Sequence, residues 1–362
     1  MGAVLALQDY WATGSTDLSS SYFSLLRTNT HYSSDVDSTG LLNTSFGRHI
    51  IDWDPWPDEE EFHQSSHFSV TQFWSLAGLK SLHLLATING SSEIAEELAA
   101  QVIALNSTIY SIMLNESTNL FCDGICLDPR VGGFSSTFSS AWALATGALD
   151  GVSQSLQSAA WQHVANHGLN GYGSYGAFMM LSSLVTFLDG DDGTAILTAL
   201  TKCDDQSWCA EMSEMNATMT RESWLDPTAT YSHPWATSPI VAIVHGIMGI
   251  KQTSPSWGSF SVAPHLGGIE GANITIPTMH GLITVIANST HTIVDVPCGS
   301  RATICALHGY SNGEEALNAG RRFVLDGVAN TRESIITRGT SYLCVDNIGC
   351  GVAGSVRSGT VA

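Results

Sequence analysis

Near residue 254 the spacing of apolar residues along the chain changes, and no single class of secondary structure accommodates both halves. Before this point apolar residues recur with a helical period, as in the run of Leu98, Leu105 and Ile109. Beyond it, short alternating stretches are separated by Pro, Gly, Asn and Ser, which is typical of β-strands. Helices followed by strands in this order predict two domains.

The first part predicts helices joined by short turns rich in Gly and Asp. One helix over Thr71–Thr87 ends at Asn89-Gly90, where Gly tolerates the left-handed conformation of a C-cap. Ser91 or Ser92 can cap the helix that follows. The other helices are predicted over Val4–Ala12, Leu18–Tyr32, Ser139–Leu149, Val152–Ala165, Tyr175–Leu188, Ala195–Lys202 and Ser238–Met248. Because no short repeat is visible, a toroid of successive helical hairpins fits better than a solenoid.

The second part predicts short strands that bury one face. They are expected over Ser259–Val262, Ala272–Ile276, Leu282–Ile286, Thr292–Val296, Ala302–Leu307, Arg322–Leu325 and Ser341–Val345. Strands of this length with turn residues between them suggest a β-sandwich. The predicted fold class is therefore mainly α with a β domain, divided into residues 1–252 and 253–362.

The charge of the chain excludes several kinds of partner. Acidic residues outnumber basic residues 33 to 13, and the formal net charge is −20. Nucleic acids and anionic membrane surfaces require a basic protein surface, so neither is expected as a partner. No apolar run reaches the roughly 18 to 20 residues that span a bilayer. The composition suits a soluble protein that acts on a neutral substrate.

Cysteine spacing and glycan-acceptor sequences point to the secretory route. The eight cysteines fall into close pairs: Cys122/Cys126, Cys203/Cys209, Cys298/Cys305 and Cys344/Cys350. Zinc sites usually need Cys-x2-Cys or matched Cys/His sets, so local disulfide loops are the better interpretation, with buried free thiols as the alternative. Asn-x-Ser/Thr recurs at Asn43, Asn89, Asn106, Asn115, Asn216, Asn273 and Asn288. Together these features favour a secreted, disulfide-bonded glycoprotein.

Two neighbouring stretches carry the most specific pattern in the chain. Asn216–Trp224 reads NATMTRESW and Tyr231–Pro239 reads YSHPWATSP, and Ile276–Gly281 follows with IPTMHG. These stretches resemble the closing region of family 78 α-L-rhamnosidases, where Gly-Ala-Thr-Thr-x-Trp-Glu-x-Trp precedes Ser-His-x-Trp-Gly-x-Ser-Pro. The resemblance also reaches Tyr10–Thr13 and Ile51–Trp53, so it covers essentially the whole chain.

The resemblance implies an (α/α)6 barrel followed by an antiparallel β-sandwich, and the hydrolysis of terminal α-L-rhamnosyl residues with inversion. Inversion uses two carboxyl groups roughly 6.5–9.5 Å apart, one ionised to activate water and one protonated to release the alcohol. By its place in the motif, Glu222 is the expected general base, which must stay ionised in a solvated or hydrogen-bonded setting. The expected partner is a rhamnosylated carbohydrate or glycoside. No cofactor is expected, and the sequence does not indicate a calcium site.

Four further residues are expected at the sugar pocket. The resemblance assigns substrate binding to His233, and Trp235 either binds the sugar or packs the pocket wall. An aromatic face suits the C–H-rich side of a deoxy sugar. Asp52 and Trp53 match the Asp-Trp of a barrel loop, where Trp53 would form the pocket floor. A single Glu or His is more often an ordinary surface or core residue, so these assignments depend on the motif.

The chain also departs from the family pattern. Asn216 replaces Gly, Met219 replaces Thr and Arg221 replaces Trp in the base motif. The family's general-acid stretch, Arg-Asp-Glu-x-x-Gly-Trp-x-Gly-Asp, does not occur in the sequence, and the acidic run Asp58–Glu61 is more simply a solvated surface. Met1–Gln8 does not form a signal peptide. We therefore expect a fragment: the C-terminal part of the barrel, lacking its first helices, and the sandwich, with the acid and the signal peptide encoded upstream.

Two other functions remain open at this stage. The chain could be a non-catalytic carbohydrate-binding remnant that keeps the pocket aromatics. It could also belong to another toroidal glycosidase, similar to glucoamylase or trehalase. The Ser-His-x-Trp stretch joined to the β-sandwich favours the rhamnosidase over this last class.

Overall fold

A computed structural model describes residues 2–30, 32–44, 52, 66–129, 133–187, 193–224, 226, 228–288, 291–307, 322–325, 341–348 and 356–360. For residues 33, 291, 304–307 and the last three ranges, the description covers the main chain alone. The chain forms two compact units. One comprises Met1–Asp9, Ser15–Asp189 and Thr198–Pro239, and the other comprises Tyr10–Gly14, Gly190–Leu197 and Ile240–Ala362. The predicted domain boundary between residues 252 and 253 stays a prediction.

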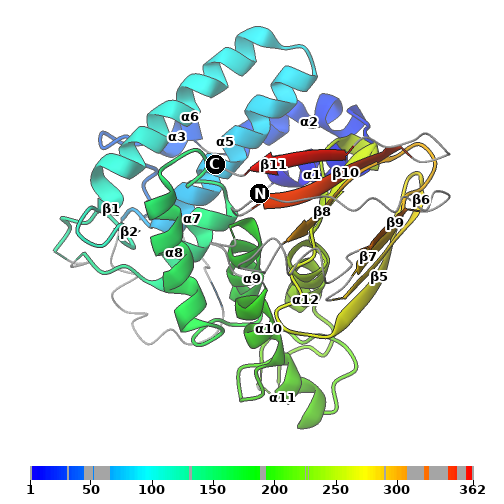
Figure 1. Cartoon of the computed structure of the whole chain (residues 1–362). Coiled ribbons are helices and arrows are strands. Elements are labelled where there is room, and N and C mark those ends of the chain that lie inside the picture. The colour runs from blue at the N-terminus through cyan, green and yellow to red at the C-terminus, as the bar shows by residue number, and fades with distance from the viewer. Residues whose placement is uncertain are drawn as a thin grey trace. The chain divides into compact units, whose positions relative to one another are not determined.

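Helices make up most of the chain before the sheets (Figure 1). The α-helices are α1 (Gly2–Thr13), α2 (Asp17–Thr28), α3 (Tyr32–Asp35), α5 (Ser69–Ile88), α6 (Ser92–Met113), α7 (Thr137–Ala145), α8 (Gln154–His167), α9 (Gly176–Thr186), α10 (Thr194–Thr201), α11 (Trp208–Ser213) and α12 (Ser238–Val241). Each helix predicted from the 3.6-residue period has a counterpart among them.

The hairpin of α5 and α6 shows how the sequence builds this part. The two helices lie side by side and join at Asn89-Gly90, where Gly90 has a φ of +73°, as the predicted left-handed stop requires (Figure 1). α5 buries Phe73, Leu76, Leu79, Leu82 and Leu85, and α6 buries Leu98, Leu105, Ile109 and Met113. Ser91 is the N-cap of α6, but its side chain makes no capping hydrogen bond. Packing of the apolar faces therefore stabilises this hairpin more than capping does.

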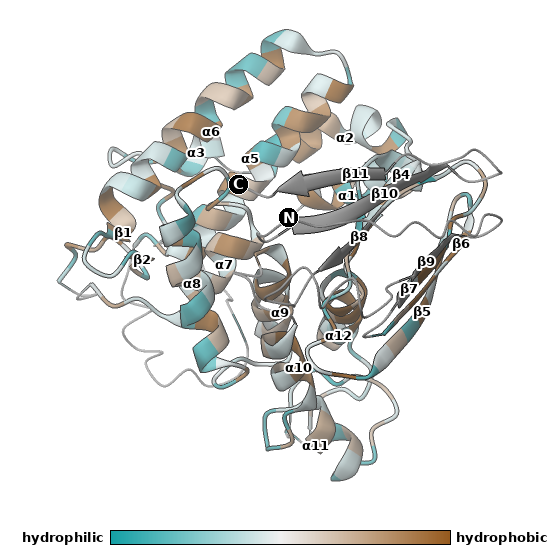
Figure 2. Ribbon diagram, in the orientation of Figure 1, coloured by the Kyte–Doolittle hydropathy of each residue, from teal (hydrophilic) through white to brown (hydrophobic). Residues whose placement is uncertain are grey.

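Helices α5, α7 and α9 form an inner row. α7 packs against both α5 and α9, whereas α6 packs on α5 and α8 packs on α7. Figure 2 shows α9 as mostly apolar, whereas α8 carries polar and apolar residues on different sides. A helix that is apolar all round must be covered on several sides, so α9 lies in the interior of this unit. This layering is that of the predicted hairpin toroid.

In the described part of the chain, nine strands form two larger sheets. They are β3 (Ile250–Gln252), β4 (Ser259–Val262), β5 (Gly271–Thr278), β6 (Gly281–Asn288), β7 (His291–Asp295), β8 (Arg301–Leu307), β9 (Arg322–Leu325), β10 (Ser341–Ile348) and β11 (Val356–Thr360). One sheet has the order β11-β10-β8-β4-β3 and the other the order β5-β6-β7-β9. The predicted β domain is confirmed, with β3 and β11 in addition to the predicted strands.

Two strand pairs in these sheets are parallel: β4 with β8, and β7 with β9. In each pair the chain passes through the other sheet between the two strands: β5, β6 and β7 lie between β4 and β8, and β8 lies between β7 and β9. A crossover of this kind permits a parallel pair, which a tight hairpin does not. All other neighbours are antiparallel. Pro277 lies in β5, which is an edge strand, where its missing N–H breaks no ladder.

Two local features are not part of the prediction. A short hairpin of β1 (Leu114–Asn115) and β2 (Leu120–Phe121) follows α6, and α12 continues as a π-helix over Ala242–Ile247. Within the described part of the chain, no helix is long and apolar enough to cross a bilayer.

The structure contains disulfides Cys122–Cys126 and Cys203–Cys209, as predicted. Cys298 is also disulfide-bonded. The pairs Cys298/Cys305 and Cys344/Cys350 involve side chains outside the described part and stay predictions.

Candidate active site

Three hydrogen bonds hold the main chain of Glu222, which lies in the loop after α11. The Glu222 N–H donates to the Thr230 carbonyl at 3.1 Å. The Glu222 carbonyl accepts hydrogen bonds from Ser174 Oγ at 2.5 Å and from Trp235 Nε1 at 3.1 Å. A residue fixed at both its N–H and its carbonyl directs its side chain consistently, which is what a catalytic group needs.

Thr230 also binds the Glu222 carboxylate. Its N–H and its Oγ1 both donate to Glu222 Oε2, at 3.1 and 3.0 Å. The backbone hydrogen bond and then the hydroxyl hydrogen bond lower the pKa of Glu222, against a smaller opposing effect of burial, and His233 lowers it further. Glu222 is therefore ionised at neutral pH. Among the described residues these donors bind Oε2 alone, which leaves Oε1 for a water molecule.

The same threonine hydroxyl sets the tautomer of a neutral His233 ring. Thr230 Oγ1 lies 2.7 Å from His233 Nδ1 and has a single proton. An ionised carboxylate only accepts, so the hydroxyl proton goes to Glu222 and the hydroxyl oxygen accepts from Nδ1–H. We assign the Nδ1–H tautomer to a neutral His233 on this basis. Its Nε2 is then an acceptor suited to a sugar hydroxyl.

Trp235 joins this pair to a second wall of the site. The rings of His233 and Trp235 have centroids 3.9 Å apart and are inclined by 34°. The Tyr175 ring contacts the Trp235 ring edge-on, with the two centroids 5.5 Å apart. Trp235 is half-buried, so part of its ring remains available to a ligand.

Asp52 lies at the N-terminus of α9. The Gly173 N–H donates to Asp52 Oδ2 at 2.7 Å, and a Cβ on Gly176 would lie only 2.0 Å from the same oxygen. A helix N-terminus favours an anion, and the absence of a side chain at Gly176 permits this close approach. Burial raises the pKa of the adjacent Tyr175, and the charge of Asp52 raises it further. Asp52 and the Tyr175–Trp235 contact thus belong to one site.

Three buried aromatic residues, Tyr172, Trp208 and Trp224, pack beneath the site residues. Trp224 Nε1 donates to the Tyr172 carbonyl at 2.7 Å, and the Trp208 ring packs edge-on against Trp224 at 5.0 Å. Trp208 Nε1 donates to the Ala236 carbonyl at 2.9 Å. The Glu222 loop is thereby tied to the segment before α9 and to the turn that carries Trp235.

Glu211 is a second acidic residue near this loop. Burial raises the pKa of Glu211 to about 7, against the opposing effects of a hydrogen bond from the Arg221 main chain and the Arg221 charge. A general acid must stay protonated near neutral pH, which this value would allow. However, Glu211 is only 2% exposed, so it cannot reach a substrate. In the described part of the chain we assign no general acid.

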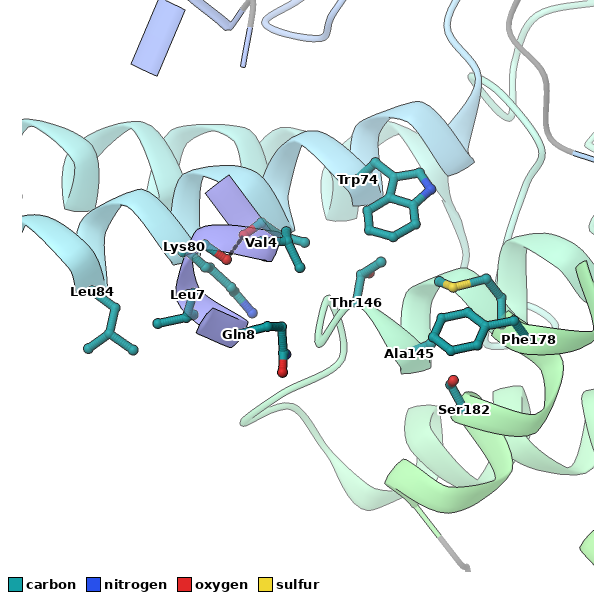
Figure 3. A pocket seen from close by; sticks show the side chains of 13 residues that line it. Val4, Leu7, Gln8, Trp74, Lys80, Leu84, Ala145, Thr146, Phe178 and Ser182 are labelled. Atoms are coloured by element: carbon teal, nitrogen blue, oxygen red, sulfur yellow. Dashed lines mark hydrogen bonds between the residues drawn. The ribbon is translucent and has the colours of Figure 1, made fainter. Parts of the chain in front are cut away.

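A cavity of about 350 Å³ lies elsewhere in the helical unit (Figure 3). Helices α1, α5 and α9 and the end of α7 line it, chiefly with apolar side chains such as those of Trp74, Leu84 and Phe178. Its cationic group, Lys80 Nζ, donates to the Gly147 carbonyl. No carboxylate lines this cavity, so it lacks the pair of groups that hydrolysis requires.

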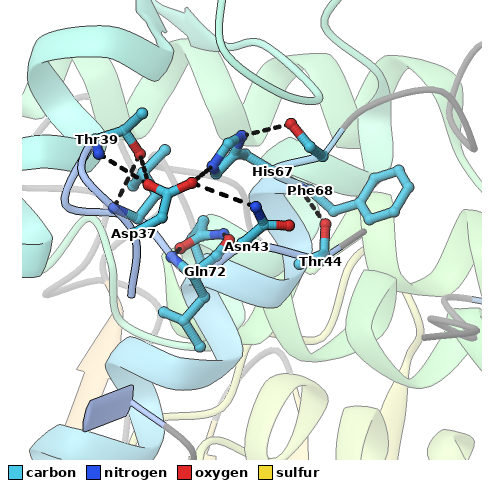
Figure 4. Close-up of polar contacts among 10 residues, drawn as sticks. Asp37, Thr39, Asn43, Thr44, His67, Phe68 and Gln72 are labelled. Carbon is cyan, nitrogen blue, oxygen red and sulfur yellow. Dashed lines mark hydrogen bonds and ion pairs between the residues drawn. The ribbon is translucent and has the colours of Figure 1, made fainter. Parts of the chain in front are cut away.

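A polar cluster around Asp37 is also separate from the site (Figure 4). Asp37 accepts hydrogen bonds from Thr39 and Asn43 and pairs with His67 Nε2 at 2.8 Å. Burial alone would raise the pKa of Asp37, but the Thr39 hydrogen bonds and the His67 contact lower it to about 2. Because these partners tie a surface turn to the start of α5, the cluster is structural.

The structure brings four of the five predicted residues together: Glu222, His233, Trp235 and Asp52. The fifth, Trp53, lies outside the described residues, and so does the run Asp58–Glu61. The sequence interpretation missed the residues that hold the site together, which are Thr230, Ser174 and Tyr175. The Gly-rich stretch Gly171–Gly176 before α9 was the available signal for the last two.

Comparisons with known proteins show what this chain resembles. No protein-family model matches the chain, and no curated protein matches it either. Solved structures do match. A GH78 family rhamnosidase of Bacillus sp. GL1 is 17% identical, with a TM-score of 0.71, over 91% of this chain and 34% of that protein.

Two further solved structures give the same result. The α-L-rhamnosidase from Aspergillus terreus has a TM-score of 0.69 at 18% identity, over 85% of this chain and 36% of that protein. The Streptomyces avermitilis α-L-rhamnosidase complexed with L-rhamnose has a TM-score of 0.65 at 15% identity, over 84% and 29%. The chain thus spans about a third of the length of these relatives. The predicted resemblance to family 78 α-L-rhamnosidases is confirmed at the level of the fold.

Proposed function

We propose that the site around Glu222 takes part in the hydrolysis of terminal α-L-rhamnosyl residues from carbohydrates or glycosides, with inversion at the anomeric carbon. The observation that carries the proposal is the Glu222 carboxylate, ionised and oriented by two donors of Thr230. It lies beside a half-buried Trp235 and a tautomerically fixed His233, on a fold shared with α-L-rhamnosidases.

In the proposed reaction Glu222 acts as the general base. Its Oε1 accepts a proton from a water molecule as the water oxygen attacks the anomeric carbon. The bond from that carbon to the leaving oxygen breaks, and a carboxylic acid on the other side of the sugar protonates the leaving oxygen. Thr230 holds Oε2 throughout, so the base does not turn away from the water.

The neighbouring residues are suited to bind the sugar. The Trp235 ring offers an apolar face to the C–H-rich side of rhamnose and to its methyl group. The Nε2 atom of His233 can accept a hydrogen bond from a sugar hydroxyl. The Asp52 carboxylate, held by the start of α9, can accept further hydroxyl hydrogen bonds. We propose that these groups set orientation and specificity.

We further propose that the protein is secreted. Disulfides such as Cys122–Cys126 and Cys203–Cys209 are typical of proteins from an oxidising compartment. An extracellular enzyme of this kind would act on carbohydrates or glycosides that carry terminal rhamnose.

The test is the variant Glu222→Gln, assayed with an aryl α-L-rhamnoside. We expect the rate to fall by roughly 10²–10⁴-fold with little change in thermal stability, because the amide cannot accept the water proton. Glu214→Gln is the matched control, since Glu214 is an exposed carboxylate just after α11. Proton NMR of the first-formed sugar should show inversion. A Glu222→Gln variant with near-normal rate would remove Glu222 from the mechanism.

Two outcomes would instead support the other functions. Binding of L-rhamnose without turnover of any aryl glycoside would favour a non-catalytic carbohydrate-binding protein. Turnover of aryl glucosides but not rhamnosides would favour another toroidal glycosidase. Both results can be read from one panel of aryl glycosides and one calorimetric titration with L-rhamnose.

A further inference from the structure

Arg221, the residue before the proposed base, is fully buried. Its exposed fraction is 0%, and it is among the largest buried side chains of the described residues. Taking a cation out of water costs several kcal/mol unless its donors and charge are compensated. The surroundings of Arg221 should therefore show what compensates it and what that arrangement does.

The guanidinium group binds main-chain carbonyls of a single turn. Nη2 donates to the Asp226 carbonyl at 2.6 Å and to the Ala229 carbonyl at 3.5 Å. Nη1 donates to the Trp224 carbonyl at 3.4 Å. All three carbonyls belong to the turn between Glu222 and Thr230, the two residues that form the proposed base.

An aromatic ring and a buried carboxyl group also lie near Arg221. The Tyr231 ring lies 4.6 Å from Cζ, within the range of a cation–π contact. Glu211, buried on α11, lies close enough for the Arg221 charge and main-chain N–H to lower its pKa against the larger effect of burial. The guanidinium thus contacts both the turn and the residue after Thr230.

The ends of the same loop are joined by main-chain hydrogen bonds. The Glu222 N–H donates to the Thr230 carbonyl, and the His233 N–H donates to the Thr220 carbonyl at 2.8 Å. These bonds hold the two ends of the loop together but do not hold the turn between Glu222 and Thr230. The Arg221 guanidinium binds that turn, because its planar fork can reach several carbonyls at once.

We propose that Arg221 is a positioning residue, whose guanidinium holds the turn from Trp224 to Ala229 so that Thr230 keeps both of its donors on Glu222 Oε2. Arg221 does not touch substrate in this role, since it is fully buried. The kinetic consequence of the proposal rests on the proposed function of Glu222, but the structural consequence does not. Without the guanidinium, the turn loses its inner partners and the N–H and Oγ1 of Thr230 move away from the carboxylate.

The test compares Arg221→Met with the wild type by ¹³C NMR titration of the glutamate carboxyl groups, with the Glu222 signal assigned from Glu222→Gln. We expect the pKa of Glu222 to rise in Arg221→Met, because it loses the hydrogen bonds that lower it. Thr230→Val should raise it less, because valine removes the hydroxyl donor and keeps the N–H donor. The double variant should titrate like Arg221→Met alone, since the loss of Arg221 already displaces both donors.

Arg27→Met is the matched control, because Arg27 is a partly exposed arginine of the same unit that pairs with Glu97. It should leave the Glu222 titration unchanged. If Arg221→Met does not fold, Arg221→Lys replaces it, since lysine keeps the charge but cannot bridge three carbonyls. A folded Arg221 variant in which Glu222 titrates as in the wild type would overturn the proposal.

Kinetics separate this proposal from the proposed function. If Glu222 is the base, Arg221→Met should lower kcat roughly tenfold or more with a smaller effect on KM, because a displaced base loses its geometry. The acid limb of the pH–rate profile should move up in pH together with the NMR titration. A titration shift in a protein with no rhamnosidase activity would support the positioning role and refute the function. An active enzyme in which the Arg221 variant leaves the Glu222 titration unchanged would support the proposed function and refute the positioning role.

Discussion

Replacing Gly176 by alanine places a methyl group where the Asp52 carboxylate lies. The new Cβ would be 2.0 Å from Asp52 Oδ2 and 2.9 Å from its Cγ, far inside van der Waals contact. The obstructing atoms are the end of a side chain, so we expect Asp52 to move while the start of α9 stays in place. The carboxylate then loses the hydrogen bond from the Gly173 N–H.

The size of the effect follows from two opposing terms. Glycine to alanine in an unobstructed helix stabilises a protein by about 0.5–1 kcal/mol. The lost hydrogen bond to a charged group costs about 1.5–3 kcal/mol, and the helix dipole adds about 0.5 kcal/mol. Because Asp52 is half-buried, we take the lower end of these costs and expect a net loss of about 1 kcal/mol.

The chain offers a matched control in Gly78, in the middle of α5. A Cβ at Gly78 would meet only a methyl group of Thr30 at 3.5 Å, which is ordinary contact. Gly78→Ala should therefore stabilise the protein, and the two variants should differ by about 2 kcal/mol in urea denaturation. L-Rhamnose affinity should fall in Gly176→Ala alone. Equal stabilisation of both variants would refute the close approach of Asp52 to α9.

Three further predictions test other parts of the structure. Thr230→Val should raise the pKa of Glu222 and move the acid limb of a pH–rate profile upward, whereas Thr230→Ser, which keeps the hydroxyl, should not. Asp37→Asn should cost about 1–2 kcal/mol of stability at neutral pH. Because the folded pKa of Asp37 is lowered to about 2, its contribution to stability is fully present above its unfolded pKa and is lost as the pH falls through 2. Acid unfolding monitored by circular dichroism should therefore show a smaller loss of stability at low pH in Asp37→Asn than in the wild type. After expression in a eukaryotic secretory host, glycopeptide mass spectrometry should find a glycan on Asn273, which is exposed on β5. It should find none on Asn106, which is half-buried within α6 and has a buried Oδ1.

The hydrophobic period was sufficient to predict most of the fold. Long amphipathic segments such as α5 and α6 have strong periodic signals, and Gly90 marks their junction. Short elements escaped prediction because few residues carry their signal. The β1–β2 hairpin has two residues in each strand, and the strand β3 has three. Such elements form because of hydrogen bonds to a neighbouring strand, which the apolar spacing of two or three residues does not reveal.

The parallel strand pairs show a different limit. Most strands of the sandwich are visible in the sequence, but which strands become neighbours depends on how the chain crosses between sheets. β4 and β8 are separated by three strands of the other sheet, so their pairing comes from the packing of two layers. The period of apolar residues predicts which face of a strand is buried, but the neighbour of that strand depends on the topology of the chain.

At the candidate site, sequence reasoning identified side chains but not the groups that orient them. Glu222 is held by a carbonyl and an N–H of Thr230, by Ser174 and by the Trp235 indole, and most of these contacts involve the main chain. Main-chain donors and acceptors are the same at every position, so no residue pattern distinguishes them. Their role becomes visible only when the fold brings them to one point.

Arg221 illustrates how this changes the meaning of a departure from a motif. In the sequence it stands where the resembling family has Trp, which on its own weakens the motif. In the structure its guanidinium lies inside the loop and binds the carbonyls of Trp224, Asp226 and Ala229. A tryptophan could fill that space but has one N–H donor, so it would leave carbonyls to be satisfied by other groups. The substitution therefore alters how the loop is held while Glu222 keeps its place, and the Arg221 variants test whether that difference reaches the base.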